Sequence, residues 1–152
     1  MFPSARVYSK GAVVLHMLRH VLGDSLFFQS LRNYASSPAL AYGSAVTEDF
    51  QAACEATSGV PLDYFFSEWA YGENYPAYSY SWSAYDSAGG SFLRLTISQE
   101  TGTVTPPFFT MPMDIKVSDA LGETTLVVFN DQKVQEFGWL LPRPPTARGA
   151  PR

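Results

Sequence analysis

Hydrophobic and polar residues follow two different periods along the chain, and the change falls near residue 72. Before it, apolar residues recur every three or four positions, which is the spacing of one face of an α-helix. The first such stripe consists of Val14, Leu15, Leu18 and Leu22. Gly23 belongs to the residue type that commonly follows a helix, and Asp24 and Ser25 can cap the next one.

Two more helices are marked by their boundary residues. Thr47 is expected to cap the third helix, with Glu48 and Asp49 beside its positive end. Gly59 ends that helix, and Pro61 opens a fourth. The pattern therefore predicts about four helices over residues 1–72.

From about residue 73 the period changes to two, which is typical of strands with one apolar face. The alternating apolar positions are Tyr78, Tyr80 and Trp82, then Leu93, Leu95 and Ile97, then Met111, Met113, Ile115 and Val117, then Leu126–Phe129, and last Phe137, Trp139 and Leu141. Turn-forming residues separate these runs at 86–90 and 119–123. Five short strands predict a small antiparallel β-sandwich over residues 73–142. Residues 143–152 are rich in Pro, Ala and Arg and are predicted to fray.

Composition supports an α+β protein with a real core. The chain has 152 residues, of which 46% are hydrophobic and 15% aromatic. The net charge of −4 is evenly spread, with 4 basic and 6 acidic residues in 1–72 and 6 and 8 in 73–152. No basic patch points to nucleic acid or anionic membrane, and no stretch reaches the ~18–20 apolar residues of a membrane span. The single Cys54 lies on an apolar stripe, so we expect it to be packed rather than nucleophilic.

One short segment carries a specific resemblance. Val7-Tyr8-Ser9-Lys10-Gly11-Ala12, followed by the apolar helix, is similar to the Tyr-x-Lys-Gly segment of the aminopeptidase N (alanyl aminopeptidase) family of zinc metallopeptidases. Further stretches agree with that family in order and spacing: Phe28 to Tyr34, Thr47-x-Asp49-Phe50, Ser58-Gly59 through Trp69, Ile97-Ser98-Gln99 and Met111-Pro112-Met113. The resemblance covers roughly residues 6–142. It implies that residues 1–72 are the C-terminal helices of a thermolysin-like catalytic domain, and residues 73–142 the β-sandwich that follows it.

The resemblance also implies a role for Tyr8. In the family, the equivalent hydroxyl lies beside the metal-bound water and donates a hydrogen bond to the oxyanion of the tetrahedral intermediate. A phenol with an ordinary pKa of ~10 keeps its proton at neutral pH, so this donation is chemically reasonable. Without the family context, a half-buried aromatic residue at a helix start would be the simpler interpretation.

The zinc-binding part of the family pattern is missing from these residues. The His-Glu-x-x-His helix, the third ligand Glu and the Gly-x-Met-Glu-Asn stretch all precede the Tyr-x-Lys-Gly segment in the family, whereas seven residues precede Tyr8 here. We therefore expect a piece of a zinc aminopeptidase that binds no zinc alone and is inactive alone. Zinc and the peptide substrate belong to the complete family enzyme, and the sequence assigns no substrate-binding residue.

Two alternatives stay open. His16 and His20 share a helix face, but Met17 stands where a general-base Glu would be needed and no third ligand is evident. We expect a surface or groove-facing pair rather than a zinc site. The second unit could instead act as a non-catalytic binding module, with Tyr78, Tyr80 and Trp82 as a platform for sugar or a partner chain, although such a row is more often core. Helix surface that normally packs on a missing part would favour self-association.

Overall fold

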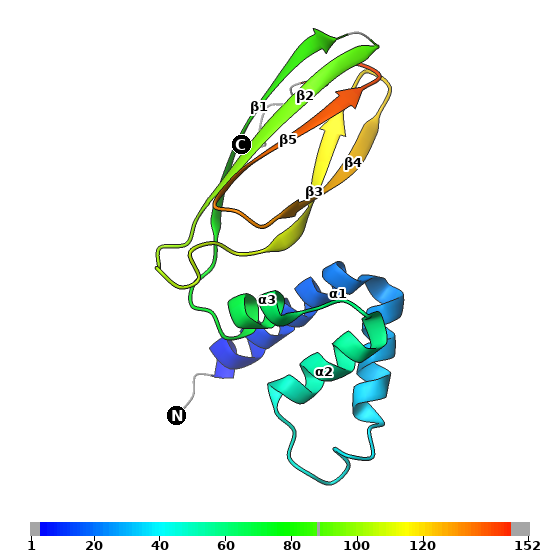
Figure 1. The fold of residues 1–152 in the computed structure, drawn as a ribbon, viewed down its shortest axis with the longest axis vertical. Coiled ribbons are helices and arrows are strands. Elements are labelled where there is room, and N and C mark those ends of the chain that lie inside the picture. Colours follow the sequence, from blue (N-terminus) through cyan, green and yellow to red (C-terminus); the bar gives the residue numbers. More distant parts are fainter. Residues whose placement is uncertain (1–3, 88, 147–152) are drawn as a thin grey trace. The chain divides into compact units, whose positions relative to one another are not determined.

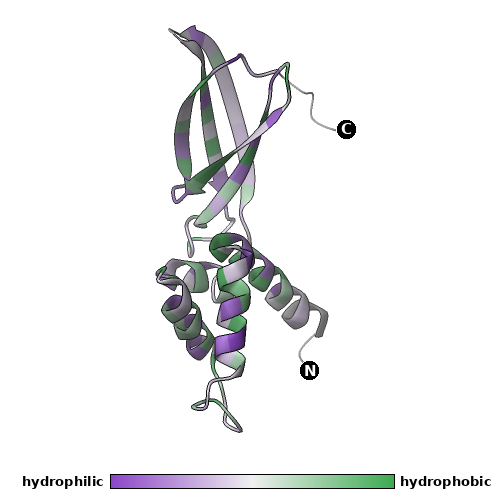
Figure 2. Cartoon of the chain, turned by 90° about the vertical axis from the view of Figure 1, so that its right-hand side faces the viewer, coloured by the Kyte–Doolittle hydropathy of each residue, from purple (hydrophilic) through white to green (hydrophobic). Residues whose placement is uncertain are grey.

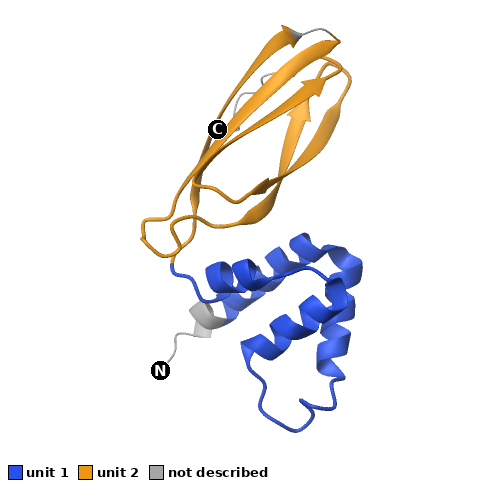
Figure 3. Cartoon of the chain, in the orientation of Figure 1, with its two compact units in different colours: residues 1–73 blue, residues 74–152 orange. Residues whose placement is uncertain are grey.

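The computed structural model describes residues 4–87 and 89–146, and the chain is built of helices followed by antiparallel strands (Figure 1). It divides into two compact units, residues 1–73 and residues 74–152 (Figure 3). The α+β class and the antiparallel sheets predicted from the sequence are confirmed. No helix in the described ranges is long and apolar enough to cross a membrane.

The first unit contains α1 (Ser4–Ala35), α2 (Thr47–Ser58), the short α3 (Asp63–Phe65) and a π-helical turn η1 (Phe66–Ala70). The first two predicted helices form the single element α1. Gly23 lies at their junction with φ 75° and ψ 160°, which is a non-helical conformation that glycine adopts readily. The sequence therefore predicted the position of the break correctly, and in the structure it is a kink within α1.

Charged side chains around the kink pair with each other. Both carboxylate oxygens of Asp24 accept from the Arg19 guanidinium at 2.7 Å, and that guanidinium lies 5.2 Å from the ring centroid of Phe28. The pKa of the Asp24 carboxyl is lowered, chiefly by the hydrogen bond from Arg19. Asp24 thus binds a side chain of the preceding turn, where the sequence pattern had suggested a helix cap.

The start of α2 also differs in detail from the prediction. Val46 is the N-cap residue, and Thr47 is the first helical residue rather than the cap. Asp49 takes over the capping chemistry, because its Oδ2 accepts from the Val46 N–H at 2.9 Å. Gly59 ends the helix in the left-handed conformation, with φ 69°, as expected. The fourth predicted helix begins at Asp63, two residues later than Pro61 indicates.

All helical elements of the first unit contribute to its core. The buried apolar residues are Leu18, Leu22, Phe27, Cys54, Leu62, Phe65 and Phe66. Edge-to-face ring contacts join Tyr34 to Phe50, Phe50 to Phe66, and Phe66 to Phe65, with centroids 5.2–6.2 Å apart. This aromatic chain connects α1, α2, α3 and η1 and fixes the turn that precedes residue 72.

The second unit consists of two antiparallel sheets. Sheet A has the order β1-β2-β5, with β1 Ala77–Ser87, β2 Gly90–Glu100 and β5 Val134–Leu141; sheet B pairs β3 (Met111–Ser118) with β4 (Glu123–Asn130). All five predicted strands are present, and polar and apolar residues alternate along them (Figure 2). Leu95, Ile97 and Val128 form a buried cluster with Met113, Ile115, Phe137 and Trp139 packed against it, so both sheets share one apolar core.

A polar network is buried at one end of this core. The Gln99 side-chain nitrogen donates to Asn130 Oδ1 at 2.7 Å and to the carbonyls of Phe109 at 2.9 Å and Gln132 at 3.1 Å. The Gln99 side-chain oxygen accepts from the Phe109 N–H at 2.8 Å. Gln99 and Asn130 are fully buried, so these bonds tie β2, β4 and the loop before β3 together.

Candidate functional site

Tyr8 lies in the second turn of α1 and its side chain is 78% exposed. The packed core of the first unit begins ten residues further along the same helix, at Leu18. The ring is therefore more exposed than the half-buried aromatic residue of the simpler interpretation. Its hydroxyl is presented to the surroundings of the first unit and is available as a hydrogen-bond donor.

Lys10, two residues after Tyr8, fixes this turn of α1 to a distant part of the chain. Its ammonium donates to the carbonyl of Gly72 at 3.1 Å, across a separation of 62 residues. Gly72 has no room for a side chain, because a Cβ there would overlap the backbone carbonyl of Glu68 in η1. The tight turn after η1 thus places the Gly72 carbonyl within reach of Lys10. The bond in turn positions the segment of α1 that carries Tyr8.

A second contact holds the turn after η1 to α2. The Tyr71 hydroxyl donates to Glu48 Oε1 at 2.6 Å, and this bond is the main cause of the lowered pKa of the Glu48 carboxyl. Glu48 and Asp49 were predicted only as favourable charges at a helix start. Asp49 is a favourable charge at the start of α2, as predicted. Glu48 also accepts a hydrogen bond from Tyr71, the residue before Gly72.

The described residues do not fit a zinc site by themselves. His16 and His20 are both exposed on α1. No group of three or more His, Cys, Asp or Glu side chains within residues 4–87 and 89–146 is arranged to hold a metal ion. A structural zinc site takes four protein ligands and a catalytic one three, so the histidine pair falls short of either.

Cys54 is enclosed in the core of the first unit. Burial raises the pKa of its thiol to about 11, with a weaker opposing effect from a hydrogen bond with Ser30 and a small further rise from the charge of Glu55. The thiolate is the nucleophilic form, so this environment suppresses its reactivity. Cys54 packs in the core and adds no chemistry to the surface around Tyr8.

The aromatic row of β1 lies in the second unit and is only partly covered. Tyr78, Tyr80 and Trp82 are paired in register with Gln99, Ile97 and Leu95 of β2. They share the inner face of sheet A with those buried residues, yet they remain 38%, 70% and 42% exposed. The sequence favoured a core role for this row, and the structure puts it on the core face but leaves it open.

Comparison with known proteins addresses the helical unit first. Residues 1–69 match the model of the peptidase family M1 domain. The helical unit belongs to peptidase family M1. Aminopeptidase M1 of Arabidopsis thaliana is 43% identical over 72 residues, which is 47% of this chain and 8% of that protein. Aminopeptidase N of Lactococcus lactis subsp. lactis is 35% identical over 79 residues, which is 52% of this chain and 9% of that protein.

A solved structure extends the likeness to both units. The Legionella pneumophila aminopeptidase A, determined in complex with aspartic acid, aligns with a TM-score of 0.76 and 20% identity. The alignment covers 94% of this chain and 16% of that one, so at this identity it shows a shared fold. Residues 1–69 correspond to a fragment of an M1 aminopeptidase, and the chain spans less than a tenth of the curated relatives that it matches. The aminopeptidase family predicted from the sequence is confirmed by the match of residues 1–69.

The sequence and the structure together distribute the candidate site over three elements. The motif around Tyr8 pointed to α1 from the sequence alone. The roles of Lys10, Gly72 and Tyr71 were missed, because their contacts join residues far apart in the chain. The only sequence signal for Lys10 was its fixed place in the Tyr-x-Lys-Gly motif.

Proposed function

We propose that this chain forms one wall of a zinc-aminopeptidase active site and contributes Tyr8 as a hydrogen-bond donor to the oxyanion of peptide hydrolysis. The observation that carries the proposal is the exposed Tyr8 hydroxyl on a turn of α1 fixed by the Lys10–Gly72 bond. In this proposal the five strands are the β-sandwich that follows the catalytic domain. Zinc in the complete enzyme would supply the activated water, and the described residues provide no ligand set for it.

The chemical contribution of Tyr8 is electrostatic. Negative charge develops on the carbonyl oxygen as water adds to the peptide bond, and a preorganised O–H donor stabilises that charge more than the ground state. The Lys10 tether matters because a donor that is held in place needs no reorganisation during the reaction. Loss of one such donor typically lowers kcat by about 10²–10³.

A chimeric enzyme tests the role of Tyr8. Residues 1–69 replace the matching segment of the Lactococcus lactis aminopeptidase N, and hydrolysis of an aminoacyl-arylamide is measured with zinc content as a check. Tyr8→Phe should lower kcat by about 10²–10³ at unchanged zinc content. Tyr42→Phe is the matched control, because Tyr42 is fully exposed in the segment between α1 and α2 and loses only a hydroxyl. A chimera that keeps its kcat after Tyr8→Phe would refute the role.

The isolated chain provides a separate test of inactivity. Supplied with Zn²⁺, it should hydrolyse the arylamide no faster than buffer, since the described residues lack a ligand set for the metal. Turnover that disappears in the Tyr8→Phe variant would show that the chain is active alone and would overturn this part of the proposal.

We also propose that the chain self-associates through the exposed surface of α1. Exposed apolar side chains along this helix include Tyr8, Val13, Leu15, Leu26 and Phe28. Such a series is uncommon on a monomer and is typical of surfaces that are covered in an assembly. Size-exclusion chromatography of the isolated chain should show self-association that Val13→Lys weakens. A monomer at high concentration would contradict the proposal.

A further inference from the structure

Tyr71, the residue before the Gly72 acceptor, is bound through both its backbone and its side chain. Its N–H donates to the Phe66 carbonyl at 3.0 Å and closes η1. Its hydroxyl donates at 2.6 Å to Oε1 of Glu48, which lies in the first turn of α2. Because Phe66 is buried, Tyr71 is attached to the core of the first unit at one end and to α2 at the other.

The side chain of Tyr71 contributes mainly through its hydroxyl. It is 58% exposed, so its ring buries little apolar surface. The bond to Glu48 is short, and it is the main cause of the lowered pKa of the Glu48 carboxyl, which is therefore ionised at neutral pH. Hydrogen bonds to an ionised acceptor are stronger than those between neutral groups. Loss of the hydroxyl should thus free the turn after η1 and leave the core of the unit intact.

The turn that Tyr71 holds supplies the acceptor for Lys10. The Gly72 carbonyl accepts from the Lys10 ammonium at 3.1 Å, and Gly72 itself packs tightly against the backbone of η1. Residues 8–13 are all exposed, so core packing of the first unit does not hold this part of α1. Displacement of Tyr71 would move the Gly72 carbonyl and weaken the bond that restrains the turn carrying Tyr8.

We propose that Tyr71 and Glu48 are positioning residues for Tyr8. Glu48 holds Tyr71, and Tyr71 holds the residue that bonds to Lys10, two positions from Tyr8. The proposal rests on the proposed role of Tyr8 as a donor to the oxyanion. Its two residues need no contact with the substrate, because they act by keeping the Tyr8 hydroxyl in place before the reaction. Their loss can therefore cost no more than the loss of the donor itself, about 10²–10³ in kcat.

Kinetics of the chimera test this positioning role. The inserted segment is extended to residues 1–73, the whole first unit, so that it contains every contact of the network. Tyr71→Phe should lower kcat for the aminoacyl-arylamide about tenfold at unchanged KM and zinc content, because small displacements of a catalytic donor are costly. In a Tyr8→Phe background the same change should lower kcat less than about twofold, since the group that it positions has already been removed.

Two substitutions of Glu48 separate geometry from charge. Glu48→Gln keeps an oxygen that accepts from Tyr71, so kcat should stay within about twofold, whereas Glu48→Leu should act like Tyr71→Phe. Both remove the same charge from the start of α2, so any effect of the helix dipole is equal in the two variants. Thr57→Val is the control, because Thr57 accepts from Asn33 at 3.0 Å in a contact between α2 and the far end of α1. It should leave kcat unchanged.

Hydrogen exchange of the whole chain tests the same link without any activity. The amides of residues 12–14 donate within α1 to the carbonyls of residues 8–10, so their exchange reports opening of the helix around Tyr8. Tyr71→Phe should make their exchange about threefold faster. The amides of residues 26–30, which include buried positions of the core, should keep their rates.

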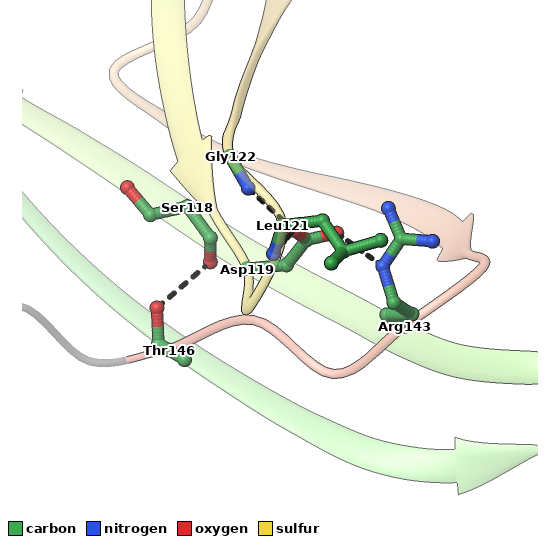
Figure 4. A network of polar contacts seen from close by, with 6 residues as sticks. All are labelled: Ser118, Asp119, Leu121, Gly122, Arg143 and Thr146. Carbon is green, nitrogen blue, oxygen red and sulfur yellow. Dashed lines mark hydrogen bonds and ion pairs between the residues drawn. The ribbon is translucent and has the colours of Figure 1, made fainter.

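An ion pair in the second unit supplies the matched control for this measurement. Arg143 Nε donates to Asp119 Oδ2 at 2.8 Å, so here too a carboxylate accepts from a side chain distant in sequence (Figure 4). Beside it, the Thr146 N–H donates to the Ser118 carbonyl at 2.8 Å. Residues 143–146, which the sequence assigned to a frayed tail, are thus held at the end of β3; the rest of that tail lies outside the described residues. Arg143→Ala removes the ion pair and should leave exchange in α1 unchanged.

The outcomes separate this proposal from the role of Tyr8. Equal losses of kcat from Tyr71→Phe with and without the Tyr8 hydroxyl would overturn the positioning role, as would an equal loss from Thr57→Val or unchanged exchange in α1. If Tyr8→Phe lowers kcat but Tyr71→Phe does not, the positioning role fails while the role of Tyr8 stands. If Tyr8→Phe leaves kcat unchanged, both roles fail together.

Discussion

Replacing Gln99 by leucine should destabilise the second unit by about 4 kcal/mol. The substitution roughly conserves volume but removes the Gln99 amide, whose two N–H hydrogens are shared among three acceptors and whose oxygen accepts from the Phe109 N–H. Each such bond contributes a net ~1 kcal/mol, and a buried partner that loses its bond costs more than an exposed one. Gln99 is fully buried, so water cannot replace these bonds without opening the end of the core.

Urea denaturation followed by tryptophan fluorescence measures this loss. A Trp69→Phe background leaves Trp82 and Trp139 as reporters of the second unit. With a urea m-value of roughly 1–1.5 kcal/mol/M for a unit of this size, the midpoint should fall by about 3 M or the unit should be unfolded in buffer. Gln132→Leu is the control, because that side chain is exposed and its change should stay within about 0.5 kcal/mol. Equal midpoints for the two variants would refute the importance of the buried amide.

Three further predictions concern single groups. Because burial raises the pKa of the Cys54 thiol to about 11, alkylation at neutral pH should be on the order of 100-fold slower in the folded chain than in urea, and rapid labelling would contradict this. The pKa of Asp119 is lowered, chiefly by the Leu121 N–H, so its stabilising effect is present above the unfolded pKa of ~3.9 and is lost as the pH falls through the lower folded value. Thermal unfolding of Asp119→Asn should therefore depend less on pH below about 4 than that of the unchanged chain, and parallel profiles would contradict this. Gly72→Ala should destabilise the first unit by at least ~1 kcal/mol in thermal melts, since a Cβ overlaps a backbone carbonyl of η1, whereas Gly43→Ala, with ordinary contacts, should not.

The strands were predictable because their signal is local. Burial of Leu93, Leu95 and Ile97 follows from strict alternation, which any strand with one covered face imposes. The register could not be predicted in the same way, since it depends on which strands become neighbours. The exposure of Tyr80 is an example: the alternation assigned it correctly to the inner face, but the absence of an opposing strand among the described residues is a property of the sheet order.

Helix boundaries were predictable where a glycine adopts a positive φ, and less so where a side chain caps the helix. Gly23 and Gly59 adopt positive φ, as expected for glycines that interrupt or end helical chain. Thr47 was assigned as a cap because its hydroxyl can serve that purpose, but Asp49 caps the Val46 N–H instead. A side chain three residues into the helix reaches back equally well, so composition near a helix start does not decide which residue caps it.

The candidate site was predictable from its motif but not from its supports. Tyr8 and Lys10 share one short segment, whereas Gly72 and Tyr71 follow the last helix of the unit. The bond from Lys10 and the bond from Tyr71 to Glu48 arise only when α1, α2 and η1 are packed together. Residues that act by positioning a functional group are thus the part of a site that a single sequence predicts least.

The proposed catalytic role makes a specific demand on the chain. The Tyr8 donor lies on α1 and needs metal ligands that the described residues do not provide, so its effect is measurable only in a larger assembly. The chimera carries residues 1–69 of this chain without residues 74–152, so its activity tests the helical unit by itself. Catalysis should therefore depend on Tyr8 although the second unit is absent, and a chimera that needed residues 74–152 for activity would contradict the assignment of this role to the helical unit.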